Sequence, residues 1–419
     1  MTNQNLHIVH LGVSGFPIGF GSIQRLILLY KGLQHAGANV LVINRTAMHG
    51  KNKEIKREGV FEGVPYVYTC PDIYRKKGFL SRRKSDFLGR IGEYKLLKKL
   101  KKEGKLDAAS VYLTGRIGQL LYYRLLSRLF RFPIILSYVE YRSAIKNRKL
   151  KKKWIQWNDK LYDKYSAKYA DGVLPISEFL IEVIKRKAPG TPFIKSPVIT
   201  DFDRFSVEDH SKEDPVKFLY VGAASYKELI TFVLRSFEML EGKAELNMVL
   251  GGSESQFEPV KEYVSGLNKK EAIFLYNNLE DWEIPVKMSE ANALLIPLRS
   301  NIQDEARFPH KVGEYVASGK PLITTNYGEI RYYFEDGKNA LVADEYSERL
   351  FTNKMEEVIN FPAKAVEIGK EGQALGKEYF DHKKHGVEIL NFIKEILGVK
   401  NISYTSEVNE NHHGHRQPT

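Results

Sequence analysis

The chain has 419 residues, of which 43% are hydrophobic and 27% charged, as in a folded protein with room for two sizeable domains. It carries a net charge of +13 and a single cysteine, Cys70, so no intrachain disulfide can form. No apolar run approaches the roughly 18 residues of a spanning helix, and the first residues lack the pattern of a signal peptide. We therefore expect a reducing, cytoplasmic location.

The charge is divided unevenly along the chain. Residues 1–200 carry 38 Lys and Arg against 14 Asp and Glu, a charge of +24, whereas residues 201–419 carry 26 against 37, a charge of −11. Such asymmetry indicates an anionic partner on one side and supports a domain boundary near residue 200.

The chain begins with a βαβ pattern. A strand at Leu6–Leu11 leads into a glycine-rich loop over residues 12–21, a helix at Ile23–Gly32 and a second strand at Val40–Ile43. This order is typical of a parallel, doubly wound sheet.

Residues 51–105 are polar and basic, and Glu93–Glu103 predicts a basic amphipathic helix. It is either a solvated helix that packs one apolar stripe into the domain, or a patch that touches an anionic membrane surface. Both interpretations stay open. The first half then continues with further predicted elements: strands Ala108–Leu113, Pro133–Val139 and Gly172–Ser177, and helices Gly118–Phe130 and Asp159–Tyr169.

The second half restarts the same pattern after a linker at Pro197–Asp203. Its predicted strands are Lys217–Val221, Leu246–Leu250, Ala272–Leu275, Ala293–Pro297 and Leu322–Thr325. Two such halves predict an α/β fold with two Rossmann-like domains facing across a cleft. We expect a basic amino-terminal domain over 1–200 and a carboxyl-terminal domain over 201–380. A helix over 381–398 packs back on the first domain, and a polar, disordered tail covers 399–419.

The segment from Arg307 to Val342 has the pattern of a ligand site. A predicted helix, Val312–Ser318, is stopped by Gly319 and Pro321. A helix amino terminus attracts phosphate, Lys311 adds a cation, and Glu314 suits the two hydroxyls of a ribose. The alternative is that Glu314 only complements the helix dipole.

This segment resembles the donor site of the retaining GT-B glycosyltransferases known as glycosyl transferases group 1. The similar residues are the run Phe308–Ile323, with Glu314-Tyr315 and Gly319-Lys320-Pro321, and the later Asp336–Val342. Weaker likeness covers nearly the whole chain.

The resemblance implies roles for individual residues. Glu314 matches the second glutamate of the E-x7-E motif, which holds the donor ribose, and Lys227 matches a lysine that binds the donor phosphates. The donor side also includes Gly222, Arg299, Phe308, Pro309, His310 and Lys311, and the acceptor and phosphate loop includes Gly19, Gly21 and Arg25.

Three positions depart from the family pattern. The first glutamate of E-x7-E falls at Ala306, where Asp304 and Glu305 are neighbouring substitutes. The arginine usually paired with Lys227 falls near Ala223, with Arg299 or Arg307 as replacements. The customary double glycine is split by Phe20.

The resemblance implies transfer of a sugar, with retained configuration, from a nucleotide diphosphate sugar to a hydroxyl of a glycan or lipid-linked acceptor. Glu140 and Glu305 are the candidate catalytic residues, and Glu140 is otherwise a carboxylate paired with Arg142. The sequence shows no compact cluster of metal-ligand type, so we expect neither a metal nor a cofactor. We expect synthesis of a bacterial cell-surface polysaccharide on the inner face of the plasma membrane.

Three other functions fit parts of the sequence. A nicotinamide-dependent enzyme predicts G-x-G-x-x-G, but Gln24 stands where the third glycine is needed. A nucleic-acid-binding protein fits the charge, yet no binding motif is present and no specific nucleic acid is expected. A non-catalytic sugar- or nucleotide-binding subunit remains as an alternative because of Ala306 and Ala223.

Overall fold

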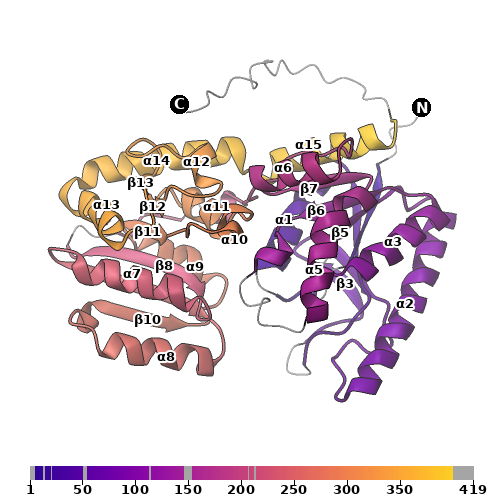
Figure 1. Ribbon diagram of the computed structural model, residues 1–419, viewed down its shortest axis with the longest axis horizontal. Helices are drawn as coiled ribbons and strands as arrows, with labels where there is room; N and C mark the ends of the chain where they lie inside the picture. The colour runs from indigo at the N-terminus through magenta and orange to yellow at the C-terminus, as the bar shows by residue number, and fades with distance from the viewer. Residues whose placement is uncertain are drawn as a thin grey trace.

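The computed structural model describes residues 5–12, 15–19, 21–50, 54–112, 115–145, 153–205, 207–211 and 214–399. It has two α/β domains side by side, each with its own sheet covered by helices (Figure 1). The predicted fold class is therefore confirmed. Of the tail predicted over 399–419, all but Val399 lies outside the described residues.

The amino-terminal sheet has seven strands in the order β3-β4-β2-β1-β5-β6-β7. All neighbours pair in parallel except β3 and β4, which form a hairpin that the sequence did not predict. Its turn is Glu62-Gly63, with both residues at positive φ, as a two-residue turn of type I′ requires. The strands are β1 His7–Leu11, β2 Asn39–Asn44, β3 Glu58–Phe61, β4 Val64–Tyr68, β5 Ala108–Tyr112, β6 Ile134–Tyr138 and β7 Gly172–Pro175.

The longest helix of this domain is α2, Phe79–Lys102, which begins 14 residues before the predicted start at Glu93. Two glycines within it explain the difference. A Cβ on Gly89 would lie 2.2 Å from the carbonyl oxygen of Arg45, and one on Gly92 would lie 2.3 Å from that of Thr69. These residues weaken the helical pattern locally but let α2 pack closely on the sheet. The other helices are α1 Gly21–His35, α3 Ile117–Phe130, α5 Lys153–Tyr165 and α6 Glu178–Lys187.

The carboxyl-terminal sheet has six parallel strands in the order β10-β9-β8-β11-β12-β13. They are β8 Val216–Ala223, β9 Ala244–Gly251, β10 Ile273–Asn277, β11 Ala293–Ile296, β12 Leu322–Thr325 and β13 Leu341–Ala343. The helices are α7 Lys227–Met239, α8 Glu254–Ser265, α9 Glu283–Ser289, α10 Ile302–Glu305, α11 His310–Ala317, α12 Ile330–Tyr333, α13 Glu348–Asn360 and α14 Pro362–Tyr379.

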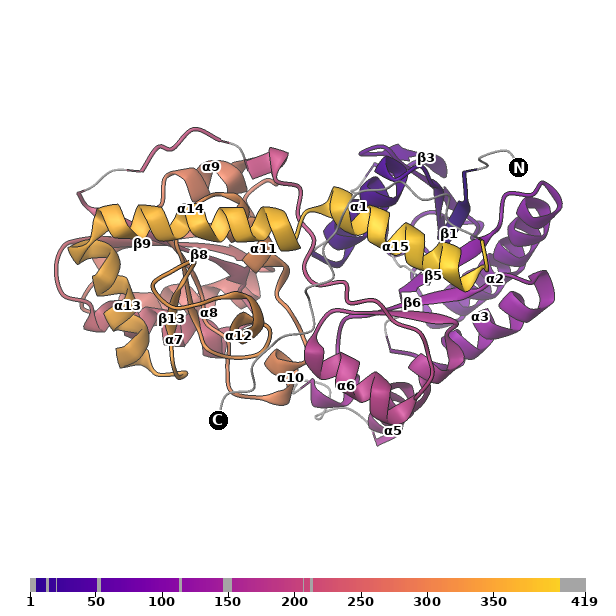
Figure 2. The same ribbon diagram turned by 90° about the horizontal axis from the view of Figure 1, so that it is seen from above.

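The chain crosses between the domains twice at one place. The amide of Thr200 donates to the carbonyl of Phe380, and the amide of His382 donates back to that of Thr200. After this crossing α15, His382–Ile396, lies along α1 on the amino-terminal domain (Figure 2). Within the described ranges, no helix combines the length and apolar character needed to cross a membrane.

Candidate functional site

A cavity of about 770 Å³ lies between the two domains. Its walls come from the loop before α1 and the end of β6 on one side, and from the end of β8 and the start of α11 on the other. This is where parallel α/β sheets place ligands, beyond the carboxyl ends of the strands. Ten predicted site residues line it: Gly19, Gly21, Arg25, Glu140, Gly222, Phe308, Pro309, His310, Lys311 and Glu314.

Helix α11 begins at His310, with Pro309 as its N-cap residue, two residues before the predicted start. Lys311 therefore lies in the first turn and Glu314 in the second. The helix comes close to the linker because a Cβ on Gly313 would lie only 2.1 Å from Oγ1 of Thr200. The position of α11 in the cavity wall is therefore set partly by its contact with the linker at Thr200.

Glu314 is an ionised carboxylate in a buried place. It is 5% exposed, and Nζ of Lys311 lies 2.5 Å from its Oε2. Burial by itself would raise the pKa of Glu314, but Lys311 and His310 outweigh burial and lower it. Burial lowers the pKa of His310 to about 4, so this ring is neutral near pH 7. The carboxylate can therefore accept hydrogen bonds from a pair of hydroxyls.

Besides Lys311, Arg307 is a cation of the carboxyl-terminal wall. Its NH2 lies 2.7 Å from Oδ1 of Asp304, and its guanidinium lies over the ring of Tyr226 at 5.6 Å. The fully buried Asp304 also accepts from Nε of Arg299 at 2.8 Å, and Arg299 in turn reaches Glu228. Arg299 is thus held behind the cavity by carboxylates, and Arg307 lines the cavity.

Two further predicted residues lie away from the cavity lining. Glu305 accepts two hydrogen bonds of 2.6 Å from NH2 of Arg331. Lys227 is exposed on the first turn of α7. Ala306 is fully buried, and its carbonyl accepts from Ser177 of the other domain at 2.9 Å. At the position where the E-x7-E motif has its first glutamate, the backbone of this chain therefore makes a contact between the two domains.

On the amino-terminal side of the cavity, Arg25 binds the backbone of the interdomain linker. Its guanidinium donates to the carbonyls of Ser196 at 2.7 Å and Pro197 at 2.5 Å, which ties α1 to the linker. Burial lowers the pKa of Arg25 to about 10. Glu140 forms an ion pair with Arg142. The alternative interpretation of Glu140, a carboxylate paired with Arg142, therefore describes its contacts.

The sequence analysis missed part of the lining. Asn278, at a φ of 52°, lies directly after β10, and its side chain bridges the amide and the carbonyl of Gly252, both at 2.8 Å. Tyr112 and Tyr226 also line the cavity. The rule that ligands bind at the carboxyl ends of strands would have found Asn278, Gly252 and Tyr112.

Residues 201–375 match the family model described as glycosyl transferases group 1. No curated protein matches the sequence significantly. Several solved structures have a similar fold. Sucrose-phosphate synthase from Thermosynechococcus elongatus has a TM-score of 0.75 at 14% identity, covering 94% of this chain and 100% of that chain.

Two others extend this comparison. Anabaena HepE, in complex with UDP and glucose, has a TM-score of 0.66 at 14% identity, covering 93% of this chain and 100% of that chain. The lipopolysaccharide outer core galactosyltransferase WaaB has a TM-score of 0.61 at 16% identity, covering 93% and 99%. These similarities show that the chain has the two-domain GT-B fold and that its residues 201–375 are similar to the glycosyl transferases group 1.

Proposed function

We propose that the protein transfers a sugar from a nucleotide diphosphate sugar to a hydroxyl of a glycan or lipid-linked acceptor, with retained configuration. The observation that carries this proposal is Glu314, a carboxylate kept ionised beside Lys311 in the interdomain cavity. HepE, which has a similar fold, binds UDP and glucose, in agreement with a nucleotide donor. The retained configuration is what the resemblance to the group 1 family implies.

The cavity wall carries positive groups that can stabilise a departing diphosphate. The first amides of α11 have no acceptors inside the helix, so they and the helix dipole attract phosphate oxygens. Arg307 and Lys311 add two cations at the same wall. Such preorganised positive charge stabilises the leaving group as the glycosidic bond breaks. We expect this to proceed without a metal or another cofactor.

The acceptor reaches the cavity from the amino-terminal domain, whose residues 1–200 have a charge of +24. This charge favours an anionic membrane surface, worth about 1 kcal/mol for each Lys or Arg near the lipid headgroups. We place the reaction in bacterial cell-surface polysaccharide synthesis, at the inner face of the plasma membrane. WaaB, a galactosyltransferase of lipopolysaccharide, has a similar fold.

The test is nucleotide binding by the wild type and by Glu314→Gln. We expect UDP or GDP to raise the melting temperature of the wild type, and the substitution to weaken binding about tenfold or more because a charged hydrogen-bond acceptor is lost. Glu335→Gln, an exposed carboxylate of the same domain, is the matched control. Equal binding by both variants would refute the site. Binding without turnover of any nucleotide sugar would favour the non-catalytic alternative.

A further inference from the structure

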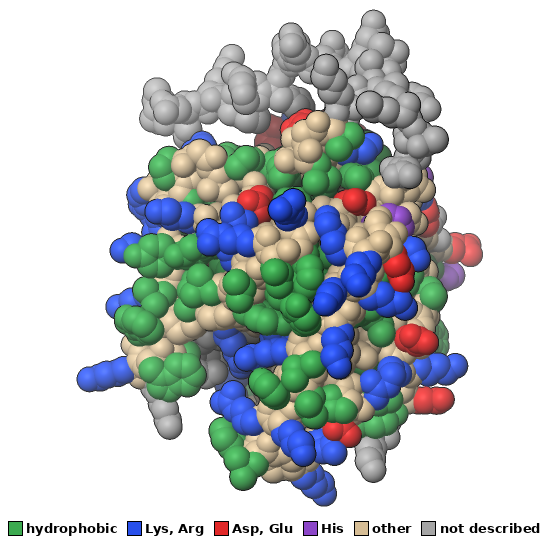
Figure 3. All heavy atoms as spheres, turned by 90° about the vertical axis from the view of Figure 1, so that its right-hand side faces the viewer, with side chains coloured by type: hydrophobic (Ala, Val, Ile, Leu, Met, Phe, Trp, Pro, Cys, Tyr) green, Lys and Arg blue, Asp and Glu red, His purple; other side chains and the backbone are tan. Residues whose placement is uncertain are grey.

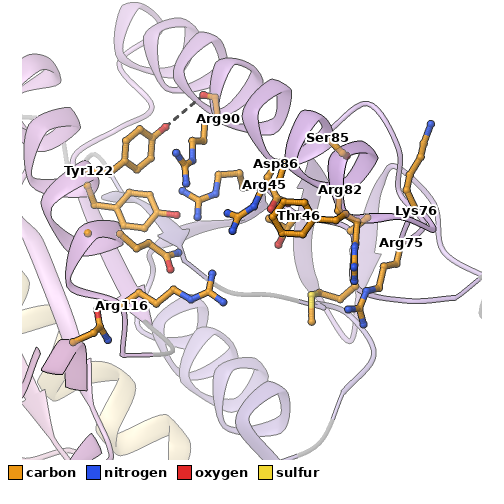
Figure 4. Close-up of a pocket in the computed structure, with 18 of the residues that line it drawn as sticks. Arg45, Thr46, Arg75, Lys76, Arg82, Ser85, Asp86, Arg90, Arg116 and Tyr122 are labelled. Atoms are coloured by element: carbon orange, nitrogen blue, oxygen red, sulfur yellow. Dashed lines mark hydrogen bonds between the residues drawn. The ribbon is translucent and has the colours of Figure 1, made fainter. Parts of the chain in front are cut away.

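A second cavity, of about 980 Å³, lies wholly within the amino-terminal domain. It is enclosed by the end of β2, helix α2 and the amino-terminal ends of α3 and α5. Figure 4 shows cationic side chains from several of these elements around one space. Six arginines line it: Arg45, Arg75, Arg82, Arg83, Arg90 and Arg116. We call this cavity the arginine pocket.

The positive charge of the arginine pocket is poorly compensated. Among its lining residues Asp86 is the single carboxylate, whereas Lys76 adds a seventh cation. Lys76 is paired with Asp72 at 3.1 Å. Within the described part of the chain, the guanidinium groups of the arginines at 75, 82, 90 and 116 lie within 4 Å of no carboxylate. Like charges that have no carboxylate within ion-pair distance repel one another, so the pocket favours a multivalent anion.

The inner wall of the pocket is built around Arg45. Its guanidinium lies 3.7 Å from the buried Glu93 and over the rings of Tyr122 and Tyr123, at 5.4 and 5.6 Å. Tyr123 donates to Glu93 at 3.2 Å, and the hydroxyl of Tyr122 donates to the carbonyl of Arg90 at 3.4 Å (Figure 4). Arg45 is therefore preorganised, which reduces the entropy lost when it binds a ligand.

The two helices that line the pocket, α2 and α3, also carry exposed apolar side chains beyond its lining residues. On α3, Leu121, Leu125 and Leu129 are 45%, 64% and 56% exposed, and their spacing of four residues makes one stripe. On the neighbouring α2, Leu80 and Phe87 are 80% and 61% exposed. Figure 3 shows this end of the molecule, where apolar side chains are interleaved with many Lys and Arg and few carboxylates. A ligand with a charged head and an apolar chain suits this combination.

The pocket is connected to the interdomain cavity by direct contacts. Asn158, which lines the pocket, donates to the carbonyl of Gly115 at 2.6 Å. A Cβ on Gly115 would lie 2.1 Å from Nε of Arg142, and Arg142 pairs with Glu140 in the interdomain cavity. Both cavities are thus lined by residues at the carboxyl ends of parallel strands of the amino-terminal sheet, the arginine pocket at β2 and the interdomain cavity at β5 and β6.

We propose that the arginine pocket binds the diphosphate head of a lipid-linked acceptor, whose apolar chain lies against the exposed stripe of α3. The pocket combines positive charge, exposed leucines on α3 and contacts that lead to the interdomain cavity. An amphiphilic diphosphate fits this combination better than a free anion or a polar glycan. This inference rests on the proposed function and gives its acceptor a chemical class.

The test compares two probes by titration calorimetry, inorganic pyrophosphate and farnesyl diphosphate. We expect the wild type to bind farnesyl diphosphate at least about tenfold more tightly, because its chain buries apolar surface. Arg90→Ala/Arg116→Ala removes two exposed cations and should weaken binding of both probes about tenfold or more. Leu121→Ser/Leu125→Ser should remove the preference for farnesyl diphosphate and leave pyrophosphate binding unchanged.

The matched control is Lys95→Ala/Lys98→Ala, which removes two exposed positive charges from α2 outside the pocket and should change neither affinity. If this control loses as much affinity for both probes as the arginine variant does, binding depends only on the overall positive charge of the domain, and the proposal is overturned. Vesicles of phosphatidylglycerol that bind through Arg90 and Arg116, without binding of farnesyl diphosphate, would assign the pocket to membrane phospholipid instead. UDP binding is measured in the same variants. If UDP binds and farnesyl diphosphate does not, this inference alone fails, whereas absence of UDP binding refutes the donor site.

Discussion

Gly32 of α1 and Gly386 of α15 meet backbone to backbone. A Cβ built on Gly386 would lie 2.1 Å from the carbonyl carbon of Gly32, and one on Gly32 would lie 2.1 Å from the carbonyl oxygen of His382. This contact holds the last helix on the amino-terminal domain after the chain has crossed from the other domain. Any side chain at either position must push the two helices apart.

Gly386→Ala should therefore lower the free energy of unfolding by about 1–3 kcal/mol, the usual cost of overpacking. Urea unfolding measures this change. Gly266→Ala is the control, since that glycine follows α8 at a φ of −88° with its nearest neighbour atom at 3.6 Å. Equal stability of the Gly386 variant and the wild type would show that the α1–α15 contact is looser than described.

Asp304 forms ion pairs with two arginines beside the interdomain cavity. Asp304→Asn should cost about 3–5 kcal/mol, because it leaves Arg299 and Arg307 without their buried partner. The two arginines outweigh burial and lower the pKa of Asp304, so the stabilisation is present above the ordinary aspartate range and is lost as the pH falls below it. The variant should lack this acid dependence. Unfolding curves at pH 7 and pH 3 measure both effects, and a variant as stable as the wild type at pH 7 would contradict the assignment.

Glu93 makes the stability of the amino-terminal domain depend on pH in the opposite direction to Asp304. Burial raises its pKa to about 7 from an ordinary value of 4.5, although Arg45 and two tyrosine hydroxyls act in the opposite direction. The folded state then holds a proton that the unfolded state has lost, so stability is greatest below pH 4.5 and falls as the pH rises to about 7. Between pH 4.5 and pH 8 the wild type should lose about 3 kcal/mol relative to Glu93→Gln. Parallel stability curves for the two proteins would contradict this prediction.

The substitution Ala306→Glu tests whether the first glutamate of the E-x7-E motif can be introduced into this chain. Ala306→Glu places a carboxylate at a fully buried position whose carbonyl bonds Ser177. We expect a loss of stability of about 3 kcal/mol or more and no gain in turnover, since an unpaired buried charge is costly. Thermal unfolding and sugar-transfer assays measure the two outcomes. A stable variant with higher turnover would show that the side chain reaches the donor sugar.

Local patterns in the sequence determined the architecture. The alternation of apolar strands with helices of 3.6-residue periodicity predicted two parallel sheets, since both signals depend on residues close in the chain. The sequence also predicted the helix that carries Glu314, because glycine, proline and charge at a helix terminus act locally. Helix α2 was predicted short because Gly89 and Gly92 serve contacts with distant backbone. The hairpin of β3 and β4 was missed because β3 has only four residues, none of them buried, so it lacks a clear apolar pattern.

Tertiary structure decided which charged groups line the interdomain cavity. In the sequence Arg299 and Arg307 are equivalent candidates, but Asp304 and Glu228 hold the first behind the cavity that the second lines. Likewise the basic residues between 45 and 116 formed only a general positive charge until the fold brought six arginines around one pocket. Charge interactions act through space, so their partners depend on packing between segments far apart in the chain, and no local pattern contains that information.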